Sequence, residues 1–351
     1  MSVASVFRTQ ARSSAELGSP FMARLHTLFA ERLAPGTPIT DRLFDWPGDM
    51  GAGGGVVPVR LAGALHALVL DGTDPALAAV YADPARLDDD ALWAAISAAM
   101  ARHEARILDW LDRVPQTNEV RRSVALIAVA RWLTARHGLP LALSELGASA
   151  GLNLMFDRYA LAVGGRVWGP ADAALTLTPD WDGPPPAEAD PVVAARAGCD
   201  LAPLDPVADR LRLLAYVWAD QPDRLTRTAA ALDLAARERP RIDRADAADW
   251  LAARLAAPQP GRLHLVYHTI AAQYFPAEVR ARIAALLAGA GARATAEAPL
   301  AHMAMEGDGR LDSAALTLTV WDGGPGSGAA MAMGRVDYHG RFIRWDPPQG
   351  A

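Results

Sequence analysis

The sequence predicts an α/β protein with a mainly parallel sheet, preceded by a helical N-terminal region. Apolar residues in the first third recur at helical spacing. From residue 139 onward, short apolar strands alternate with helical segments, an order typical of parallel sheets with crossover helices. Two strands near the C-terminus are joined by the glycine-rich residues 323–328, which indicates an antiparallel hairpin at the sheet edge.

The helical region is expected to cover residues 1–115. Residues 21–33 place their apolar side chains on one helical face, at Phe21, Leu25, Leu28 and Phe29. Two further helices are expected at residues 59–70 and 90–114. Between them and the first helix, residues 45–55 are rich in glycine but are not followed by Gly-Lys-Ser/Thr. This segment is therefore interpreted as a flexible loop and not as a phosphate-binding loop.

Residues 116–351 are expected to form the α/β domain. A long helix at 119–137 is closed by Gly138 and Pro140, and residues 139–146 form a buried strand. A helix from about 152 to 159 follows, then a β-hairpin insertion near 160–190, whose strands at 160–167 and 174–179 are separated by Trp168-Gly-Pro. The other expected elements are helices at 213–218, 222–237, 247–256 and 276–287, and strands at 241–246, 262–268, 293–298, 315–320 and 330–337.

Composition excludes several reaction classes. All 34 basic residues are arginine, so chemistry that needs a lysine amine, such as pyridoxal phosphate catalysis, is excluded. The single Cys199 cannot form an internal disulfide or a multi-cysteine metal site, and no metal is expected. A net charge of −6 argues against nucleic-acid binding. Without a signal peptide or a membrane-spanning apolar run, we expect a cytoplasmic bacterial protein that acts on a small-molecule substrate; its oligomeric state is left open.

One motif carries the functional interpretation. The apolar strand at 141–146 delivers Glu145 near its C-terminal end, and Gly147, Ser149 and Gly151 follow at alternate positions. Ligands of open α/β sheets bind at the carboxyl ends of the strands, where small residues let them approach the backbone. The dinucleotide fingerprint Gly-x-Gly-x-x-Gly is not met, which disfavours a nicotinamide-dependent oxidoreductase.

This motif resembles the first motif of class I S-adenosylmethionine-dependent methyltransferases, (Asp/Glu)-x-Gly-x-Gly-x-Gly, with Ser149 in place of the central glycine. The resemblance implies a Rossmann-like methyltransferase fold of seven strands, the last two forming an antiparallel hairpin. It also implies S-adenosylmethionine as cofactor. The residues it places beside the methionine part of that cofactor are Glu145, Gly147, Ala148, Ser149 and Gly151.

The chain also resembles, over nearly its whole length, an uncharacterised bacterial family, domain-of-unknown-function family 2332. The segments that carry this resemblance are Trp46-Pro-Gly-Asp, Leu61-Ala-Gly-Ala-Leu-His-Ala-Leu, Gln116-Thr-Asn-Glu-Val-Arg-Arg-Ser123, Glu145-Leu-Gly-Ala-Ser-Ala-Gly-Leu-Asn-Leu154, Gly198-Cys-Asp-Leu-Ala-Pro-Leu-Asp205 and Val336-Asp-Tyr-His-Gly-Arg. The family implies a methyltransferase-like fold and supplies no substrate.

Three acids are candidates for the rest of the cofactor. The methyltransferase resemblance implies an acid after the second strand that binds the ribose hydroxyls, for which Asp200 and Asp205 both qualify. It also implies an Asp after the third strand that bonds the adenine amine, which fits Asp246. Each of these residues could instead be a helix N-cap or a turn residue.

His268 closes the strand at 262–268, where the resemblance places residues beside the transferred methyl group. A histidine there could act as a general base, or be a hydrogen-bonded structural residue. Asn118, Glu119 and Arg122 begin the helix before the glycine motif and are further candidates for the pocket. The alternative is that Thr117 caps this helix and Glu119 favours its dipole.

The functional hypothesis is methyl transfer from S-adenosylmethionine to a small or medium acceptor, with His268 or Glu119 removing a proton where the acceptor requires it. The alternative is a non-catalytic ligand-binding or regulatory protein on the same fold. Ser149 in place of glycine, and the absence of Asn/Asp-Pro-Pro-Tyr after the fourth strand, favour this alternative mildly.

Overall fold

The computed structural model describes residues 2–348, which divide into two compact units. The first unit holds the chain up to Thr117 together with Ala208–Ala229, and the second holds Asn118–Val207 and the chain from Ala230 onward. The segment Ala208–Ala229, which the sequence analysis placed in the α/β region, is thus grouped with the helical residues. Within the described residues, no helix is both long and apolar enough to span a membrane.

The first unit is built from helices. They are α1 (Val3–Glu16), α2 (Pro20–Arg32), α3 (Pro38–Phe44), α4 (Val57–Leu70), α5 (Pro75–Ala82), the short 3₁₀ helix η1 (Pro84–Arg86), α6 (Asp89–Arg102), α7 (Glu104–Leu111) and α9 (Arg210–Ala215). The single helix expected at 90–114 is therefore wrong, because the chain breaks at His103. The backbone of His103 leaves the helical region (φ −118°, ψ 27°), and its ring contacts the buried carboxylate of Asp74 at 3.0 Å.

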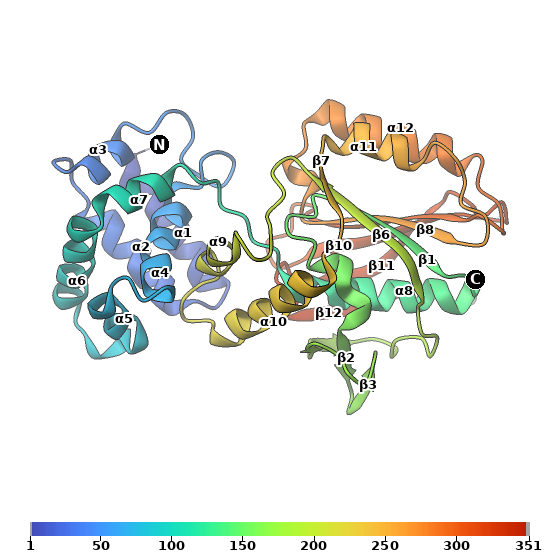
Figure 1. Cartoon of the computed structure of the whole chain (residues 1–351), viewed down its shortest axis with the longest axis horizontal. Coiled ribbons are helices and arrows are strands. Elements are labelled where there is room, and N and C mark those ends of the chain that lie inside the picture. Colours follow the sequence, from blue (N-terminus) through green and yellow to red (C-terminus); the bar gives the residue numbers. More distant parts are fainter. Residues whose placement is uncertain (1, 349–351) are drawn as a thin grey trace. The chain divides into compact units, whose positions relative to one another are not determined.

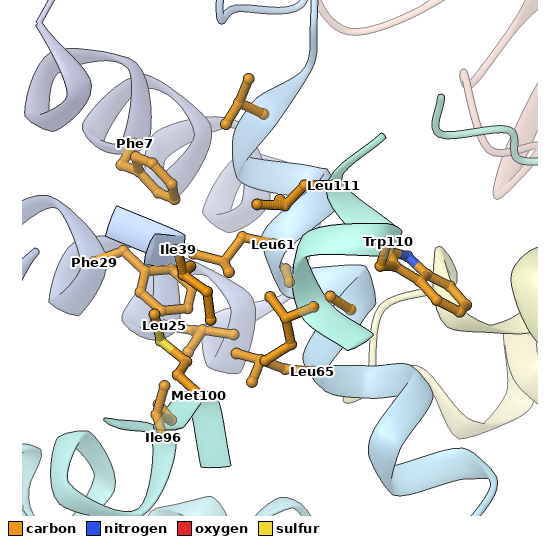
Figure 2. Close-up of a cluster of buried hydrophobic side chains, with 14 of the residues drawn as sticks. Phe7, Leu25, Phe29, Ile39, Leu61, Leu65, Ile96, Met100, Trp110 and Leu111 are labelled. Carbon is orange, nitrogen blue, oxygen red and sulfur yellow. The ribbon is translucent and has the colours of Figure 1, made fainter. Parts of the chain in front are cut away.

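The core of this unit is a cluster of apolar side chains from α1, α2, α3, α4, α6 and α7 (Figure 2). The four residues expected on one face of the helix at 21–33 are all buried, which confirms the helical spacing of α2. Leu61 and Leu65 of α4 lie in the same cluster and are fully buried. Burial of a side chain of this size contributes about 1.5–3 kcal/mol.

The second unit contains a nine-stranded sheet. Its strands are β1 (Leu141–Leu146), β5 (Asp180–Asp182), β6 (Val193–Asp200), β7 (Ile242–Arg244), β8 (Leu263–Thr269), β9 (Leu300–Glu306), β10 (Ala314–Trp321), β11 (Ala330–Val336) and β12 (Phe342–Trp345). The order is β5-β12-β11-β10-β9-β8-β1-β6-β7. Strands β7, β6, β1, β8 and β9 pair parallel with one another in that order. Strands β9, β10, β11 and β12 then pair antiparallel, and the edge strand β5 is parallel to β12. The predicted α/β fold with a mostly parallel sheet is confirmed.

Helices cover both faces of this sheet (Figure 1). The α-helices of the second unit are α8 (Ser123–His137), α11 (Ala247–Arg254) and α12 (Ala277–Gly291). Helix α10 (Pro222–Glu238) is divided between the two units. In Figure 1, α11 and α12 lie on one face and α8 lies on the other. Apolar residues of α11 and α12 pack with Leu146, Val266 and Leu300 of the strands. Short 3₁₀ helices are η2 (Val120–Arg122), η3 (Asn153–Arg158) and η4 (Ala272–Tyr274).

Two helices expected near the glycine motif are present but differ in type or start, and the turn expected in the hairpin insertion is wrong. The helix expected at 152–159 is the 3₁₀ helix η3, and the helix expected from 119 is η2 followed by α8 from Ser123. The hairpin insertion has its turn at Gly164 and Gly165, and not at Trp168-Gly-Pro. Both glycines have positive φ (56° and 80°), which is the conformation that a tight two-residue hairpin turn requires. The resulting sheet is β2 (Ala160–Val163), β3 (Arg166–Trp168) and β4 (Thr176–Leu177), in the order β3-β2-β4.

Two expectations near the C-terminus also change. Residues 293–298 are not a strand, because α12 extends to Gly291 and the chain then turns through a single bridge between Thr295 and Ala298. The predicted antiparallel pair is present as β10 and β11. This pair does not lie at the sheet edge, however, because β12 and β5 add two strands beyond it.

Candidate functional site

The order of the parallel strands reverses between β1 and β8. From β1 the chain proceeds outward through β6 and β7 on one side, and then through β8 and β9 on the other. In open α/β sheets, ligands bind outside the carboxyl ends of the strands at such a reversal. The loops that follow β1 and β8, residues 147–152 and 270–275, therefore lie where a ligand site is expected.

The loop after β1 has an unusual backbone. Gly147 and Gly151 both have a φ of 73°, and Ser149 between them has a φ of 53°. The left-handed conformation costs a residue with a side chain about 1–2 kcal/mol, and glycine adopts it freely. The position at which the sequence has serine instead of glycine is thus one where the backbone conformation favours glycine.

The same loop is tied to the end of β6. The backbone N–H groups of Gly147 and Ala148 donate to the carbonyl of Cys199, both at 2.9 Å. The N–H of Ser149 donates to Asp200 Oδ2, also at 2.9 Å. A Cβ placed on Gly198 would lie 2.6 Å from the Cβ of Ala148, so the loop packs closely against this strand.

The loop after β8 meets the loop after β1. A Cβ on Gly147 would lie 2.7 Å from the Cβ of Ala271, so these two loops are in direct contact. Ile270, which precedes Ala271, has a φ of 52°. This conformation is a genuine outlier for a β-branched residue. Backbone strain of this kind clusters at functional sites, and here two strained positions, Ser149 and Ile270, lie on the two loops that flank the strand reversal.

Glu145 belongs to a buried polar network on one face of the sheet. Its carboxyl group is nearly inaccessible, and it accepts a long hydrogen bond of 3.5 Å from the hydroxyl of Tyr267. The same hydroxyl lies 3.4 Å from the carbonyl of Asn153. Burial raises the pKa of Glu145 well above its ordinary value, although the Tyr267 hydrogen bond opposes this shift. Glu145 thus lies inside the protein beneath the loop.

Asn118 and Glu119 hold the glycine loop from the side of α8. Asn118 Oδ1 accepts a hydrogen bond of 2.9 Å from the N–H of Leu152, and the carbonyl of Glu119 accepts one of 3.3 Å from Asn153 Nδ2. The Glu119 side chain caps η2 by accepting from the N–H of Arg121. The alternative cap at Thr117 is therefore wrong, because the helical turn begins after Glu119.

Arg122 joins β8 to a distant turn. Its Nη1 donates to the carbonyl of Thr269 at 3.1 Å, and its Nε donates to the carbonyl of Tyr338 at 2.9 Å. Tyr338 lies in the turn between β11 and β12, and a Cβ on Gly340 in this turn would lie 2.4 Å from the carbonyl oxygen of Arg121. Arg122 thus lies at the carboxyl end of β8.

His268 forms a row with two residues of β9. In the parallel register His268 lies opposite Ala304, so His302 and Glu306 are its two diagonal neighbours on the same face. Nδ1 of His268 lies 2.7 Å from Glu306 Oε1, and its Nε2 lies 3.2 Å from His302 Nε2. Glu306 Oε1 also accepts the N–H groups of Ala271 and Ala272, at 2.9 and 3.0 Å.

Hydrogen bonds and burial decide the protonation states of Glu306 and His302. Burial alone raises the pKa of Glu306, but the hydrogen bond and charge of His268 and the two backbone donors outweigh it and lower the pKa. Burial, together with the charge of His268, lowers the pKa of His302 to about 3. At neutral pH Glu306 is therefore a carboxylate and His302 is a neutral imidazole.

The Glu145 network and the row of His268, His302 and Glu306 lie on opposite faces of the sheet. Tyr267 and His268 are consecutive in β8, and consecutive strand residues point to opposite sides. Tyr267 contacts Glu145, whereas the ring of His268 packs against Phe275 with centroids 6.5 Å apart. Asn153 joins the Glu145 side through the hydroxyl of Tyr267, and it also donates to the carbonyl of Glu119. His268 is thus brought to the same edge of the sheet as the other candidates but not to the same face as Glu145.

The three candidate acids have different surroundings. Asp200, at the end of β6, accepts from the N–H of Ser149 and from that of Ala202, at 2.9 and 2.8 Å. Asp205 is exposed and accepts from the N–H of Val207. Asp246 is the N-cap of α11 and accepts from two backbone N–H groups of that helix, so the alternative of a helix cap describes its contacts. Asp200 is bonded to the glycine loop through the N–H of Ser149.

Sequence reasoning missed Glu306, His302, Tyr267 and Asn153. The alternation His302-x-Ala304-x-Glu306 is a period-two pattern that would have placed both polar residues on one strand face. Among residues 2–348, no group of three or more His, Cys, Asp or Glu side chains is arranged to hold a metal ion.

These features define an α/β protein whose parallel sheet carries a strained glycine loop and a carboxylate–imidazole row at its carboxyl edge. The chain belongs to the family DUF2332, described as an uncharacterized protein conserved in bacteria, whose model matches residues 4–345. The family resemblance seen in the sequence is thereby confirmed. Searches among curated proteins and among solved structures found no match.

Proposed function

We propose that the second unit binds S-adenosylmethionine and transfers its methyl group to a small or medium acceptor. One observation carries the proposal: the loop at Gly147, Ser149 and Gly151, left-handed at each alternate position, lies where the strand order reverses. The parallel strands β7-β6-β1-β8-β9 follow the third-second-first-fourth-fifth order of nucleotide-binding α/β sheets. The antiparallel extension is a meander from β9 to β12 added to this parallel part.

The residues at this edge fit such a cofactor. The loop presents backbone without bulky side chains at Gly147, Ala148, Ser149 and Gly151, and Asp200 lies beside it. Each carboxylate oxygen of Asp200 already accepts one backbone N–H, and each keeps a lone pair for a ribose hydroxyl. Asp246, at the end of the third strand, would face the adenine. Bound S-adenosylmethionine would supply an activated methyl group on a sulfonium.

His268 and Glu306 would handle the proton that an acceptor loses. The Glu306 carboxylate accepts a hydrogen bond from Nδ1 of His268, and in the neutral imidazole this would leave the lone pair on Nε2. An imidazole in this tautomer can accept a proton from a hydroxyl or amine placed at Nε2, which lies 3.2 Å from His302 Nε2 in this structure. Arg122, bonded to Thr269 at the end of β8, would contribute positive charge beside the loop.

A second candidate is a non-catalytic ligand-binding or regulatory protein. The observation that favours it is that the N–H groups of Gly147, Ala148 and Ser149 all donate within the protein. Fewer backbone donors then remain for a ligand than a glycine loop can offer. On this alternative the same edge binds a ligand but transfers no group.

Isothermal titration calorimetry of the full chain with S-adenosylmethionine and S-adenosylhomocysteine tests the proposal. We expect binding to both, weakened tenfold or more in Asp200→Asn and unchanged in the matched variant Asp205→Asn. No binding at millimolar ligand would contradict the proposal. Binding without methyl transfer to any member of a broad metabolite panel would favour the non-catalytic alternative.

A further inference from the structure

The glycine-rich segment 45–55 of the first unit is followed by a residue with a strained backbone, as at Ser149 and Ile270. Val56, the N-cap of α4, has φ 50° and ψ 41°, a left-handed conformation that a β-branched residue rarely adopts. The loop is closed tightly by hydrogen bonds from Gly55 N–H to the Asp49 carbonyl and from Val56 N–H to the Gly51 carbonyl, at 2.6 and 3.0 Å. These hydrogen bonds close the loop at the N-terminus of α4.

Arg60, on the first turn of α4 after this loop, is buried without an acidic partner. It is 7% exposed, and its guanidinium donates from Nε to the Gly55 carbonyl and from Nη1 to the Leu111 carbonyl, at 2.6 and 2.8 Å. Among the residues that the structure describes, no carboxylate forms an ion pair with it. By contrast, the buried Arg131 pairs with Asp190, at 2.6 Å. Buried charges are normally paired, whereas over residues 2–348 Arg60 donates only to backbone carbonyls and has Asp112 as a nearby negative charge without a direct ion pair.

Two more arginines gather around Arg60. Arg42 and Arg60 both lie against the ring of Trp46, with guanidinium carbons 5.0 and 5.2 Å from its centroid. Arg212 donates from Nη2 to the Val114 carbonyl, and its buried Nε has no hydrogen-bond partner within the described part of the chain. The three arginines thus converge on the segment that follows α7.

The charges of this cluster do not balance. Arg42 pairs with Asp112 at 2.9 Å, and the C-terminus of α7 contributes roughly half a negative charge. Three guanidinium groups therefore face one carboxylate and a helix dipole. Burial is the main cause that lowers the pKa of Arg60; Tyr216 and Asp112 oppose this shift, and the charges of Arg212 and Arg42 add to it. An anion bound here would supply the missing negative charge.

We propose that Arg42, Arg60 and Arg212, with the ring of Trp46, form a binding site for a ligand bearing a phosphate or carboxylate group. The guanidinium fork matches both groups through paired N–H···O bonds, and the bonds of Arg60 to Gly55 and Leu111 hold its fork in place. The site lies wholly within the first unit and is independent of the methyl-transfer proposal.

Thermal unfolding and calorimetric titration of the full chain test this site, with inorganic phosphate in one arm, succinate in a second and sodium chloride at matched ionic strength as reference. We expect phosphate or succinate to raise the melting temperature above the chloride reference, and the stronger arm identifies the preferred group. Because a charge-assisted hydrogen bond contributes substantially to binding, Arg212→Gln should raise the dissociation constant of the anion roughly tenfold.

The matched control is Arg86→Gln, which removes an equal charge from an 83% exposed side chain of the same unit. It should bind as the wild type does. Arg60→Gln would also remove the hydrogen bonds of Arg60 to Gly55 and Leu111, and it could therefore fail to fold. Arg212→Gln leaves both of these hydrogen bonds in place and is used for that reason. Equal stabilisation in phosphate, succinate and chloride, or equal anion binding by the Arg212 and Arg86 variants, would overturn the proposal.

Discussion

Glu306 is the single residue that organises most of the His268 side of the candidate site. One oxygen, Oε1, accepts from His268 Nδ1 and from the N–H groups of Ala271 and Ala272. It therefore fixes the imidazole and, at the same time, the loop that contains the strained Ile270. Hydrogen bonds to a carboxylate are roughly twice as strong as neutral ones, so its charge matters as much as its shape.

Glu306→Gln should weaken the hydrogen bonds that hold the His268 imidazole and the loop after β8, while keeping the size of the side chain. The neutral amide weakens three charge-assisted bonds, so we expect the Nδ1–H tautomer of His268 to lose its preference and the amides of Ala271 and Ala272 to exchange about tenfold faster. Nitrogen-15 NMR of the imidazoles and amide hydrogen exchange measure these effects. His302→Gln, which leaves Glu306 and its three donors intact, should leave the exchange unchanged. Identical tautomer and exchange in Glu306→Gln and wild type would contradict the role of the carboxylate.

The loops after β1 and β8 act as one packed element. Gly147 has a positive φ, and its missing Cβ is the space that Ala271 occupies. Two separate costs therefore attach to a side chain at Gly147, one from the backbone and one from the collision. Gly164, in the turn between β2 and β3, isolates the first cost, because its φ is 56° and nothing lies within 4 Å of a Cβ placed there.

Gly147→Ala should destabilise the protein more than Gly164→Ala. We expect a loss of about 1–2 kcal/mol at Gly164, from the left-handed backbone alone. At Gly147 the collision with Ala271 adds about 1–3 kcal/mol. Urea unfolding followed by circular dichroism measures both variants. Equal losses would show that the two loops do not pack as closely as the Cβ geometry indicates.

Each unit of the molecule buries a neutral histidine in its interior. His26 of the first unit is fully buried, and burial lowers its pKa to about 4 despite a backbone hydrogen bond with Pro58. His264 of the second unit lies 2.8 Å from Ser144 Oγ, and burial, with the charge of Arg254, lowers its pKa to about 4. In the unfolded chain both would take up a proton near pH 6.5.

The protein should therefore lose stability in mild acid. Between about pH 6.5 and 4 the unfolded chain binds protons that the folded protein does not, so the free energy of unfolding falls as pH falls. Each histidine accounts for about 3 kcal/mol over this window. Glu145 acts in the opposite direction, because its raised pKa lets the folded state bind a proton first.

A single substitution separates these contributions. In His264→Gln the decrease in unfolding free energy between pH 6.5 and 4 should be smaller by about 3 kcal/mol than in the wild type. Urea unfolding at a series of pH values measures the difference. The same pH dependence in both proteins would show that His264 is not held neutral in the folded state.

Local spacing was enough to predict much of the architecture. The apolar face of α2, the strand β8 and the β10–β11 pair follow from periodicity and glycine placement within a few residues. The glycine loop after β1 was also found, because its residue types and its position after an apolar strand are local properties. Its left-handed backbone at Ser149 was not foreseen, since nothing local distinguishes a strained serine from a relaxed one.

The hydrogen-bond partners of Asp200 and His268 could be learned only from the tertiary structure. Asp200 and Asp205 look alike in sequence, and only the pairing of β6 with β1 brings Asp200 to the N–H of Ser149. His268 acquires Glu306 because the register of β8 with β9 makes them diagonal neighbours. Backbone periodicity depends on residues a few positions apart, whereas these contacts join residues 38 to 51 positions apart and are decided by how the strands align.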